Sequence, residues 1–280
     1  MSYSIEQLEN IAREIRTDIV RMIGFGKTGH LGGSCSVADI VAVLYFHQMK
    51  HDPKNPGMPD RDRFLLSKGH SVPAQYAALA RAGYFPLEEL TKLKAIGSRL
   101  QGHPDMRKLP GIEANTGSLG QGISMAAGMA AAGKLDRLDY RVYCVLGDGE
   151  TAEGQVWEAA MAAANYKLDN LVAILDKNRL QSTGFIAERF DIDPVSDKFR
   201  AFGWTVLECD GHNIREIIEA LDRAGESRGK GKPVLIVAHT VKGKGISFAE
   251  NNPAYHNGLM TEEQYAQALR ELGAEGSARA

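Results

Sequence analysis

Short apolar runs alternate with longer helical patterns along most of the chain, and no other feature of the sequence limits the fold as strongly. The apolar runs cover residues 63–66, 141–146, 171–175, 205–208 and 234–238, and the helical patterns cover residues 37–48, 73–82, 119–135, 155–166, 194–202 and 214–224. Strands that alternate with helices form a parallel sheet that helices cover on both faces. The sequence therefore predicts an α/β fold, and we expect residues 1–280 to form a single domain.

Capping signatures mark the start of a helix near each end of the chain. Isoleucines and leucines recur at helical spacing over residues 5–23, and Ser4 with Gln7 makes a capping box before them. Thr261 begins a second capping box, which predicts a C-terminal helix over about residues 261–273.

Composition excludes several classes of protein. A net charge of −2, with Lys and Arg scattered along the chain, gives no general attraction for the phosphates of nucleic acids. The apolar runs are too short to cross a bilayer, and the N-terminal segment is polar and amphipathic rather than a signal peptide. Cys35, Cys144 and Cys209 are odd in number and far apart. We therefore expect a protein of the reducing cytoplasm, without nucleic-acid or membrane partners.

Polar residues follow two of the predicted strands at the point where each strand ends. Gly147, Asp148 and Gly149 follow the run at 141–146, and Asn178 follows the run at 171–175. Ligands of an open parallel sheet bind beyond the carboxyl ends of its strands, so the two segments would meet if these strands are neighbours. Asp148, Asn178 and the main-chain carbonyl of Leu180 would supply the hard oxygen ligands that Mg²⁺ prefers, and the two glycines would let a phosphate approach the backbone. An ordinary Asp-Gly turn is the alternative for the Gly-Asp-Gly segment alone, but its pairing with Asn178 favours a metal site.

The same segment resembles a known family. Residues 147–178 resemble the thiamine diphosphate motif, and residues 153–159 resemble transketolases in particular. Further matches follow in the family's order at residues 29–30, 67–70, 102–104, 116–122, 203–204 and 210–212, so the resemblance covers almost the whole chain. It implies a thiamine diphosphate-binding fold of the type that holds the diphosphate. It also implies an enzyme that uses thiamine diphosphate and Mg²⁺ to transfer a two-carbon ketol unit between sugar phosphates.

The resemblance also implies which residues bind the cofactor. The positions that match His70, Gly117 and Leu119 hold the diphosphate and the thiazolium ring in the family. Lys244 lies in a segment, 242–245, that resembles the mobile loop closing over the cofactor phosphates, although a solvated lysine loop is an alternative. The remaining cofactor-binding set is Gly147, Asp148, Gly149, Glu150 and Asn178, with Asp148, Asn178 and Leu180 as metal ligands.

Residues that handle protons follow from the resemblance in the same way. His30, His103 and His256 would line the reacting end, and imidazole suits proton transfer because its ordinary pKa lies near neutrality. Asn257 stands where transketolases commonly place glycine after the last of these histidines. Glu153 matches a glutamate that joins a proton relay at the subunit contact, although a carboxylate is also favoured there by the helix dipole alone.

Two other patterns are interpreted as structural. Residues 24–29 fit the dinucleotide-binding fingerprint, but they end a helix instead of following a strand, so we expect a helix stop and a flexible loop that positions His30. His212 lies in a turn before a helix and is expected to have a structural role, although it also matches the family. The histidines lack the spacing of a zinc site.

The chain is expected to need a companion. In transketolases, the glutamate that activates the cofactor's pyrimidine ring lies in a second domain, which these 280 residues do not include. We expect a companion chain with the pyrimidine-binding and C-terminal domains, assembled as a two-fold symmetric heterotetramer (α2β2), and no catalysis by this chain alone.

Alternatives to this function remain open at this stage. Residues 29–32 also suit a 1-deoxyxylulose phosphate synthase, whereas the three early histidine loops argue against a 2-oxo acid dehydrogenase alpha subunit. A non-catalytic cofactor-binding protein is the alternative from another class. The donor and acceptor sugars also stay open: pentose and heptulose phosphates, a branched sugar phosphate and a sulfonated sugar all fit.

Overall fold

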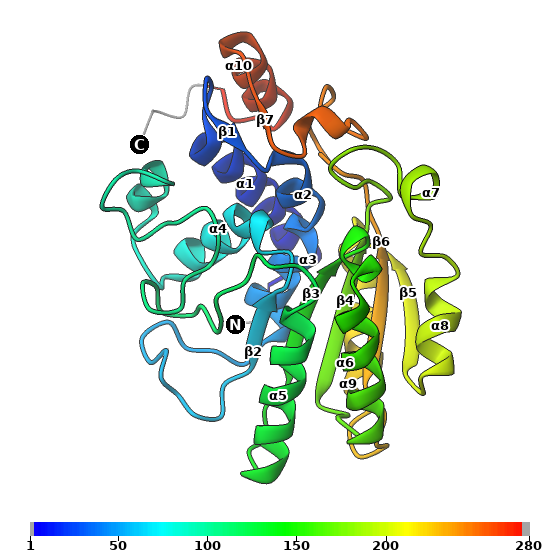
Figure 1. The fold of residues 1–280 in the computed structure, drawn as a ribbon. Coiled ribbons are helices and arrows are strands. Elements are labelled where there is room, and N and C mark those ends of the chain that lie inside the picture. Colours follow the sequence, from blue (N-terminus) through cyan, green and yellow to red (C-terminus); the bar gives the residue numbers. More distant parts are fainter. Residues whose placement is uncertain (1–2, 276–280) are drawn as a thin grey trace.

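A five-stranded parallel sheet forms the centre of the computed structural model, which describes residues 3–275 (Figure 1). Its strands are β2 (Arg63–Leu66), β3 (Val142–Gly147), β4 (Leu171–Lys177), β6 (Val234–His239) and β5 (Thr205–Asp210), in that spatial order. Every neighbouring pair runs parallel. The predicted fold is therefore confirmed, and each predicted strand is present.

Helices cover both faces of the sheet because successive strand residues point to opposite sides. Tyr143 and Val145 join one buried apolar cluster, while Cys144 and Leu146 join the other. The first face is covered by α1 (Ile5–Ile23), α2 (Leu31–Ser36), α3 (Ala38–Val43), α4 (Val72–Ala82) and α9 (Ile214–Gly225). The second is covered by α5 (Gly122–Leu135), α6 (Gly154–Asn165), α7 (Ile186–Arg189) and α8 (Val195–Ala201).

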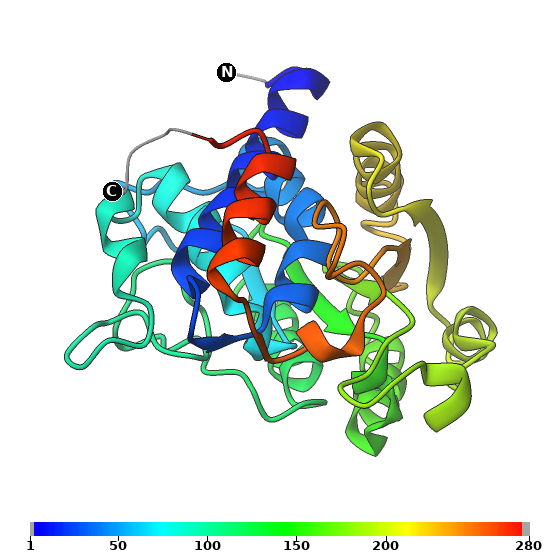
Figure 2. The ribbon, with the colours of Figure 1, turned by 90° about the horizontal axis from the view of Figure 1, so that it is seen from above.

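The capping signatures give the helices that they predict. The Ser4–Gln7 box starts α1, which spans the expected residues, and the Thr261 box starts α10 (Glu262–Glu271). In both views α10 lies beside α1 (Figures 1 and 2). The helix expected over residues 37–48 is less regular, because α3 ends at Val43 and a π-helical turn completes the segment.

The segment between α1 and α2 corrects one expectation. Gly24 ends α1 at a φ of 67°, as a helix stop should, and residues 24–27 form a loop, but this loop does not lead directly to His30. Residues 28–29 instead form a short strand, β1, which pairs antiparallel with β7 (Gly258–Leu259). This ladder fixes two segments that are far apart in sequence, and His30 and His256 both lie just beyond the end at which Gly29 pairs with Gly258.

The remaining features of the fold concern the cysteines and helix lengths. Cys35, Cys144 and Cys209 are buried as free thiols. Within residues 3–275, none of the helices is both long enough and apolar enough to span a membrane.

Candidate active site

A pocket opens at the carboxyl edge of the sheet, where β2, β3, β4 and β6 end. Its walls combine glycines, three histidines, two lysines and the polar ends of the strands. The lining residues are His30, Gly33, Lys68, His70, Gly117, Leu119, Gly147, Asp148, Gly149, Glu150, Asn178, Leu180, Gln181, Ser182, Lys242 and His256. Eleven of the residues predicted from the sequence therefore line one pocket, whereas His103, Glu153 and Lys244 do not line it.

Asp148 and Asn178 meet because β3 and β4 are neighbours with Gly147 opposite Asp176. Asp148 is 2% exposed, and its two carboxylate oxygens accept hydrogen bonds from the main-chain N–H groups of Gly149 (2.8 Å) and Arg179. Burial, together with the nearby charge of Asp176, raises the pKa of Asp148 to about 7. A buried carboxylate with an elevated pKa lacks a full counter-charge, which is the condition that a cation would relieve.

Lys242 places a positive charge in the same pocket. Its Nζ donates to the carbonyl oxygens of Leu180 (2.9 Å) and Gln181 (3.2 Å), and it lies 2.9 Å from Nδ1 of His256. The side chain is buried, and burial together with the charge of Lys68 lowers its pKa to about 8. The carbonyl of Leu180 therefore already holds a cation, as the predicted metal ligand should be able to do.

Lys244 is not brought to the pocket. It lines a separate surface hollow with Asp210 and Asn251, while Lys242, two residues earlier, enters the site instead. Between them Gly243 adopts a φ of 84°. A Cβ there would lie 2.2 Å from the carbonyl oxygen of Ala249, so only glycine fits this tight turn, and the turn sends the two lysines to different sides.

Three imidazole rings pack together at the mouth of the pocket. The ring centre of His30 lies 4.9 Å from that of His70 and 5.3 Å from that of His256, and the last two are 5.1 Å apart. Burial and neighbouring positive charges lower the pKa of His30 to about 4 and that of His256 to about 3, and lower that of His70 as well. All three rings are neutral at neutral pH, so each has one ring nitrogen that can accept a hydrogen bond.

His103 and Glu153 lie beside the pocket rather than in its lining. A Cβ added to Gly117 would lie 2.5 Å from Cδ2 of His103, so the ring packs directly behind this glycine, whose φ is 143°. Glu153 is exposed at the start of α6 and, within the described residues, its side chain makes no capping hydrogen bond. Its position agrees with the helix-dipole interpretation and leaves its carboxylate free to face solvent.

Glu150 organises the pocket wall from inside the protein. It is 2% exposed, and its carboxylate accepts from the hydroxyl of Ser67 and from the main-chain N–H groups of Gly120 (2.8 Å) and Gly147 (3.0 Å). Three loops that line the site are thereby joined by one side chain. The sequence predicted Glu150 as a cofactor contact, but its carboxylate oxygens bond to protein groups.

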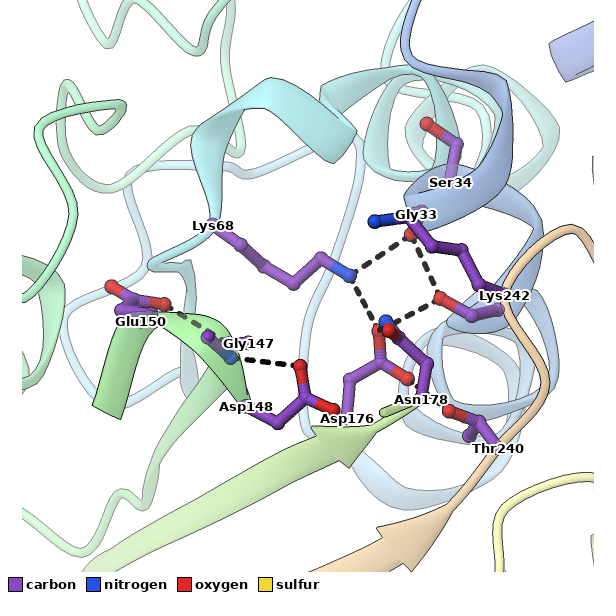
Figure 3. A network of polar contacts seen from close by, with 12 residues as sticks. Gly33, Ser34, Lys68, Gly147, Asp148, Glu150, Asp176, Asn178, Thr240 and Lys242 are labelled. Carbon is purple, nitrogen blue, oxygen red and sulfur yellow. Dashed lines mark hydrogen bonds and ion pairs between the residues drawn. The ribbon is translucent and has the colours of Figure 1, made fainter. Parts of the chain in front are cut away.

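Sequence reasoning missed a buried ion pair next to Asp148 and Asn178, between Lys68 and Asp176 (Figure 3). Nζ of Lys68 donates to Asp176 and to the carbonyl oxygen of Gly33 (3.1 Å). Asp176 also accepts from Ser36, Asn178 and Thr240. A usable signal was present, since Asp176 is a carboxylate that directly follows the five apolar residues of β4.

The fold and this pocket define an α/β cofactor-binding domain whose ligands sit at the carboxyl ends of neighbouring parallel strands. The model of one protein family, the thiamine diphosphate-binding domain of transketolase, matches residues 6–279. The chain belongs to this family, which is a family of transferases.

Several relatives are separate subunits. The chain is 49% identical to the 6-deoxy-6-sulfo-D-fructose transketolase subunit SqwG of Clostridium sp. (strain MSTE9), over 99% of this chain and 100% of that protein. It is 44% identical to one subunit of the apulose-4-phosphate transketolase of Phocaeicola vulgatus, over 96% of this chain and 94% of that protein. The chain therefore has almost the full length of these subunits.

Longer transketolases contain the same domain as a part. Human transketolase is 41% identical over 96% of this chain, which spans 42% of that protein. The solved structure of transketolase from Campylobacter jejuni superposes with a TM-score of 0.89 at 34% identity, covering 99% of this chain and 44% of that one.

Proposed function

We propose that this chain is the diphosphate- and magnesium-binding subunit of a split transketolase, which transfers a two-carbon ketol unit between sugar phosphates. The observation that carries the proposal is the meeting of Asp148, Asn178 and the Leu180 carbonyl at one edge of the sheet, inside a glycine-lined pocket. When bound, thiamine diphosphate supplies the carbanion chemistry at the carbonyl carbon of the donor sugar.

The residues present fit a magnesium–diphosphate group. Asp148 provides one carboxylate with an elevated pKa, and the Leu180 carbonyl already accepts from an ammonium group. One carboxylate and two neutral oxygens leave part of the charge of Mg²⁺ unbalanced, which suits a cation that takes further ligands from phosphate oxygens. Lys242 and Lys68 add positive charge to the pocket wall, and Gly147 and Gly149 keep it open.

The histidine cluster supports a role in proton transfer. His30 and His256 are half-buried and neutral at neutral pH, so each can accept a hydrogen bond from a hydroxyl of a bound sugar, and we propose that a proton passes along such a bond during the reaction. We propose that His70 holds the cofactor beside them, with Gly117 and Leu119 forming the opposite wall. His103 would act from behind Gly117, and Glu153 would act at the contact with another subunit.

A second chain would complete the site. The pocket has a volume of about 240 Å³, which lies below the roughly 300–1,000 Å³ of sites that enclose a small ligand. We propose that this single domain pairs with a companion that carries the pyrimidine-binding and C-terminal domains, as a cytoplasmic heterotetramer with two copies of each chain. The separate-subunit relatives support this architecture.

The donor sugar is proposed from the same relatives. The names of two of them specify 6-deoxy-6-sulfo-D-fructose and apulose 4-phosphate, so a sulfonated or a branched sugar belongs beside ordinary ketose phosphates in a donor panel. Pyruvate is included because a 1-deoxyxylulose phosphate synthase would use it. Ketol transfer from a ketose donor, and not from pyruvate, is the expected result when the companion chain is added.

Calorimetry with Mg²⁺ and thiamine diphosphate tests the cofactor site. Asp148→Ala and Asn178→Ala are expected to abolish metal-dependent cofactor binding by the assembled complex. Asp136→Ala is the matched control, because Asp136 is exposed at the C-terminal end of α5, on the opposite edge of the sheet. Equal cofactor binding by all three variants would refute the proposed site.

A further inference from the structure

Asp176 is buried at the end of β4, and four donors from four segments converge on its carboxylate. Oδ2 accepts from the Ser36 hydroxyl (2.7 Å), from Nζ of Lys68 and from Nδ2 of Asn178 (2.8 Å). Oδ1 accepts from the hydroxyl of Thr240. All four donors are protein groups and Asp176 does not line the pocket, so its carboxylate is committed to the protein interior and is not presented to a metal ion.

The contact with Asn178 determines how its amide group is turned. An ionised carboxylate can only accept hydrogen bonds, so Asp176 must face the NH₂ end of the Asn178 amide. The amide oxygen is thereby turned away from Asp176, and it accepts from the main-chain N–H of Leu180 at 3.1 Å. A carbonyl-type oxygen has two lone pairs, so one stays available on the side that faces the pocket.

Lys68 makes this arrangement possible inside the protein. A second ionised carboxylate close to Asp148 would be costly to bury alone, and Asp176 is fully buried. The ammonium of Lys68 neutralises it and is itself fixed by the carbonyl of Gly33. Figure 3 shows this contact network beneath Asp148 and Asn178.

We propose that Asp176 is a positioning residue for the metal site, which holds the Asn178 amide with its oxygen toward the cation and never binds the cation itself. Groups that orient metal ligands in this way typically change metal affinity about 10–100-fold when they are removed. The inference rests on the proposed function, since it assumes that Asn178 is a metal ligand.

Binding of Mn²⁺ to the complex of this chain with its companion, in the presence of thiamine diphosphate and followed by electron paramagnetic resonance, tests the proposal. Asp176→Asn removes the group that selects the amide orientation at nearly constant volume, and it is expected to weaken Mn²⁺ binding by about 10–100-fold. If Asp176 acts through Asn178, the variant D176N/N178A should bind Mn²⁺ no more weakly than N178A alone. A merely structural role predicts instead that the two losses multiply.

Two controls separate positioning from general loosening of the pocket. Ser36→Ala and Thr240→Val each remove one donor to Asp176 without touching Asn178, so both should lower the unfolding midpoint while Mn²⁺ affinity stays unchanged. If D176N does not fold because Lys68 is left unpaired, the cycle is run in the K68M background. K68M/D176N/N178A is then compared with K68M/N178A, so that the loss caused by Lys68 itself cancels.

The outcomes distinguish the inference from the function beneath it. If the losses in the cycle multiply, or if D176N binds Mn²⁺ with the same affinity as the unaltered protein, the positioning role is overturned but the proposed metal site is not. An unaltered complex that binds no Mn²⁺ with thiamine diphosphate, or that binds it equally after Asp148→Asn, would overturn the proposed function and this inference with it.

Discussion

Asp39 lies in a buried ionic group next to the loop that carries Lys242, and neutralising it tests how that loop is held. Its carboxylate accepts from Nη1 of Arg16 at 3.1 Å, from Nη2 of the same guanidinium, and from Nδ1 of His212 at 2.7 Å. Nε2 of His212 accepts from the main-chain N–H of Val241 at 2.8 Å, which fixes the proton of the neutral ring on Nδ1. The chain of contacts thus runs from α1 through α3 to the residue before Lys242, and it gives His212 the structural role that the sequence predicted.

The size of the expected loss of stability follows from the burial of Arg16 and Asp39. Arg16 and Asp39 are 7% and 6% exposed, and within the described residues Nε of Arg16 already lacks a partner. Asp39→Asn leaves the guanidinium without its counter-charge, and removing one partner of a buried pair costs about 3–5 kcal/mol of unfolding free energy. The double variant R16M/D39L strands no charge, so the remaining cost is that of the unpaired His212 N–H, about 1–3 kcal/mol.

Urea unfolding followed by circular dichroism measures both values, with Asp136→Ala as the exposed control. Although burial alone would raise it, the charge and hydrogen bonds of Arg16 and His212 hold the pKa of Asp39 below its usual range. A depressed pKa contributes stability above the unfolded value of about 3.9, and this contribution is lost as the pH falls through the folded pKa. The difference in unfolding free energy between D39N and the unaltered chain should therefore be largest near neutral pH and should shrink below about pH 4. A decrease in the free energy of unfolding of less than about 1 kcal/mol for D39N at pH 7 would refute the reasoning. A double variant R16M/D39L that is less stable than D39N would refute it as well.

Two further predictions concern the pocket. The lowered pKa values of His30, His70 and His256 mean that the unfolded chain binds more protons than the folded one between about pH 4 and 6.5, so stability should fall as the pH falls through that window. Chemical unfolding measured across that range should show that the unfolding free energy of His30→Gln depends less on pH than that of the unaltered chain. An unchanged pH dependence would contradict the lowered pKa of His30. Lys242→Met is expected to weaken magnesium-dependent thiamine diphosphate binding by about 10–100-fold, as loss of a charged hydrogen bond does, whereas Lys244→Met leaves it unchanged. Calorimetry on the assembled complex checks this, and a larger effect of Lys244→Met would restore the prediction made from the sequence.

The positions of the proposed metal ligands could be predicted because they depend on local rules. Asp148 and Asn178 each come directly after a strand, and the carboxyl ends of neighbouring parallel strands lie at one edge of a sheet. One further fact was needed, that the two strands are adjacent, and strands consecutive in sequence are usually neighbours. Residues whose positions follow from strand ends were therefore within reach of the sequence.

The Lys68–Asp176 pair could not be predicted in the same way. Its members are 108 residues apart, and a lysine beside Gly69 and His70 in a loop would ordinarily be solvated. It becomes buried because β2 pairs with β3, and because α2 brings the carbonyl of Gly33 over the strand ends. Burial of a charge depends on such long-range packing, which residue types and spacing do not specify.

The choice between Lys242 and Lys244 shows where the limit lies. Both lysines belong to one Lys-Gly-Lys-Gly segment, so composition and spacing treat them alike. What separates them is the turn at Gly243, whose φ of 84° is available to glycine and strained for other residues. The glycine shows that such a turn is possible, but the course of the backbone through the turn is set by the close approach of Ala249. The basic group that enters the pocket is therefore determined by backbone packing around Gly243, and a motif that names only the residue types cannot identify it.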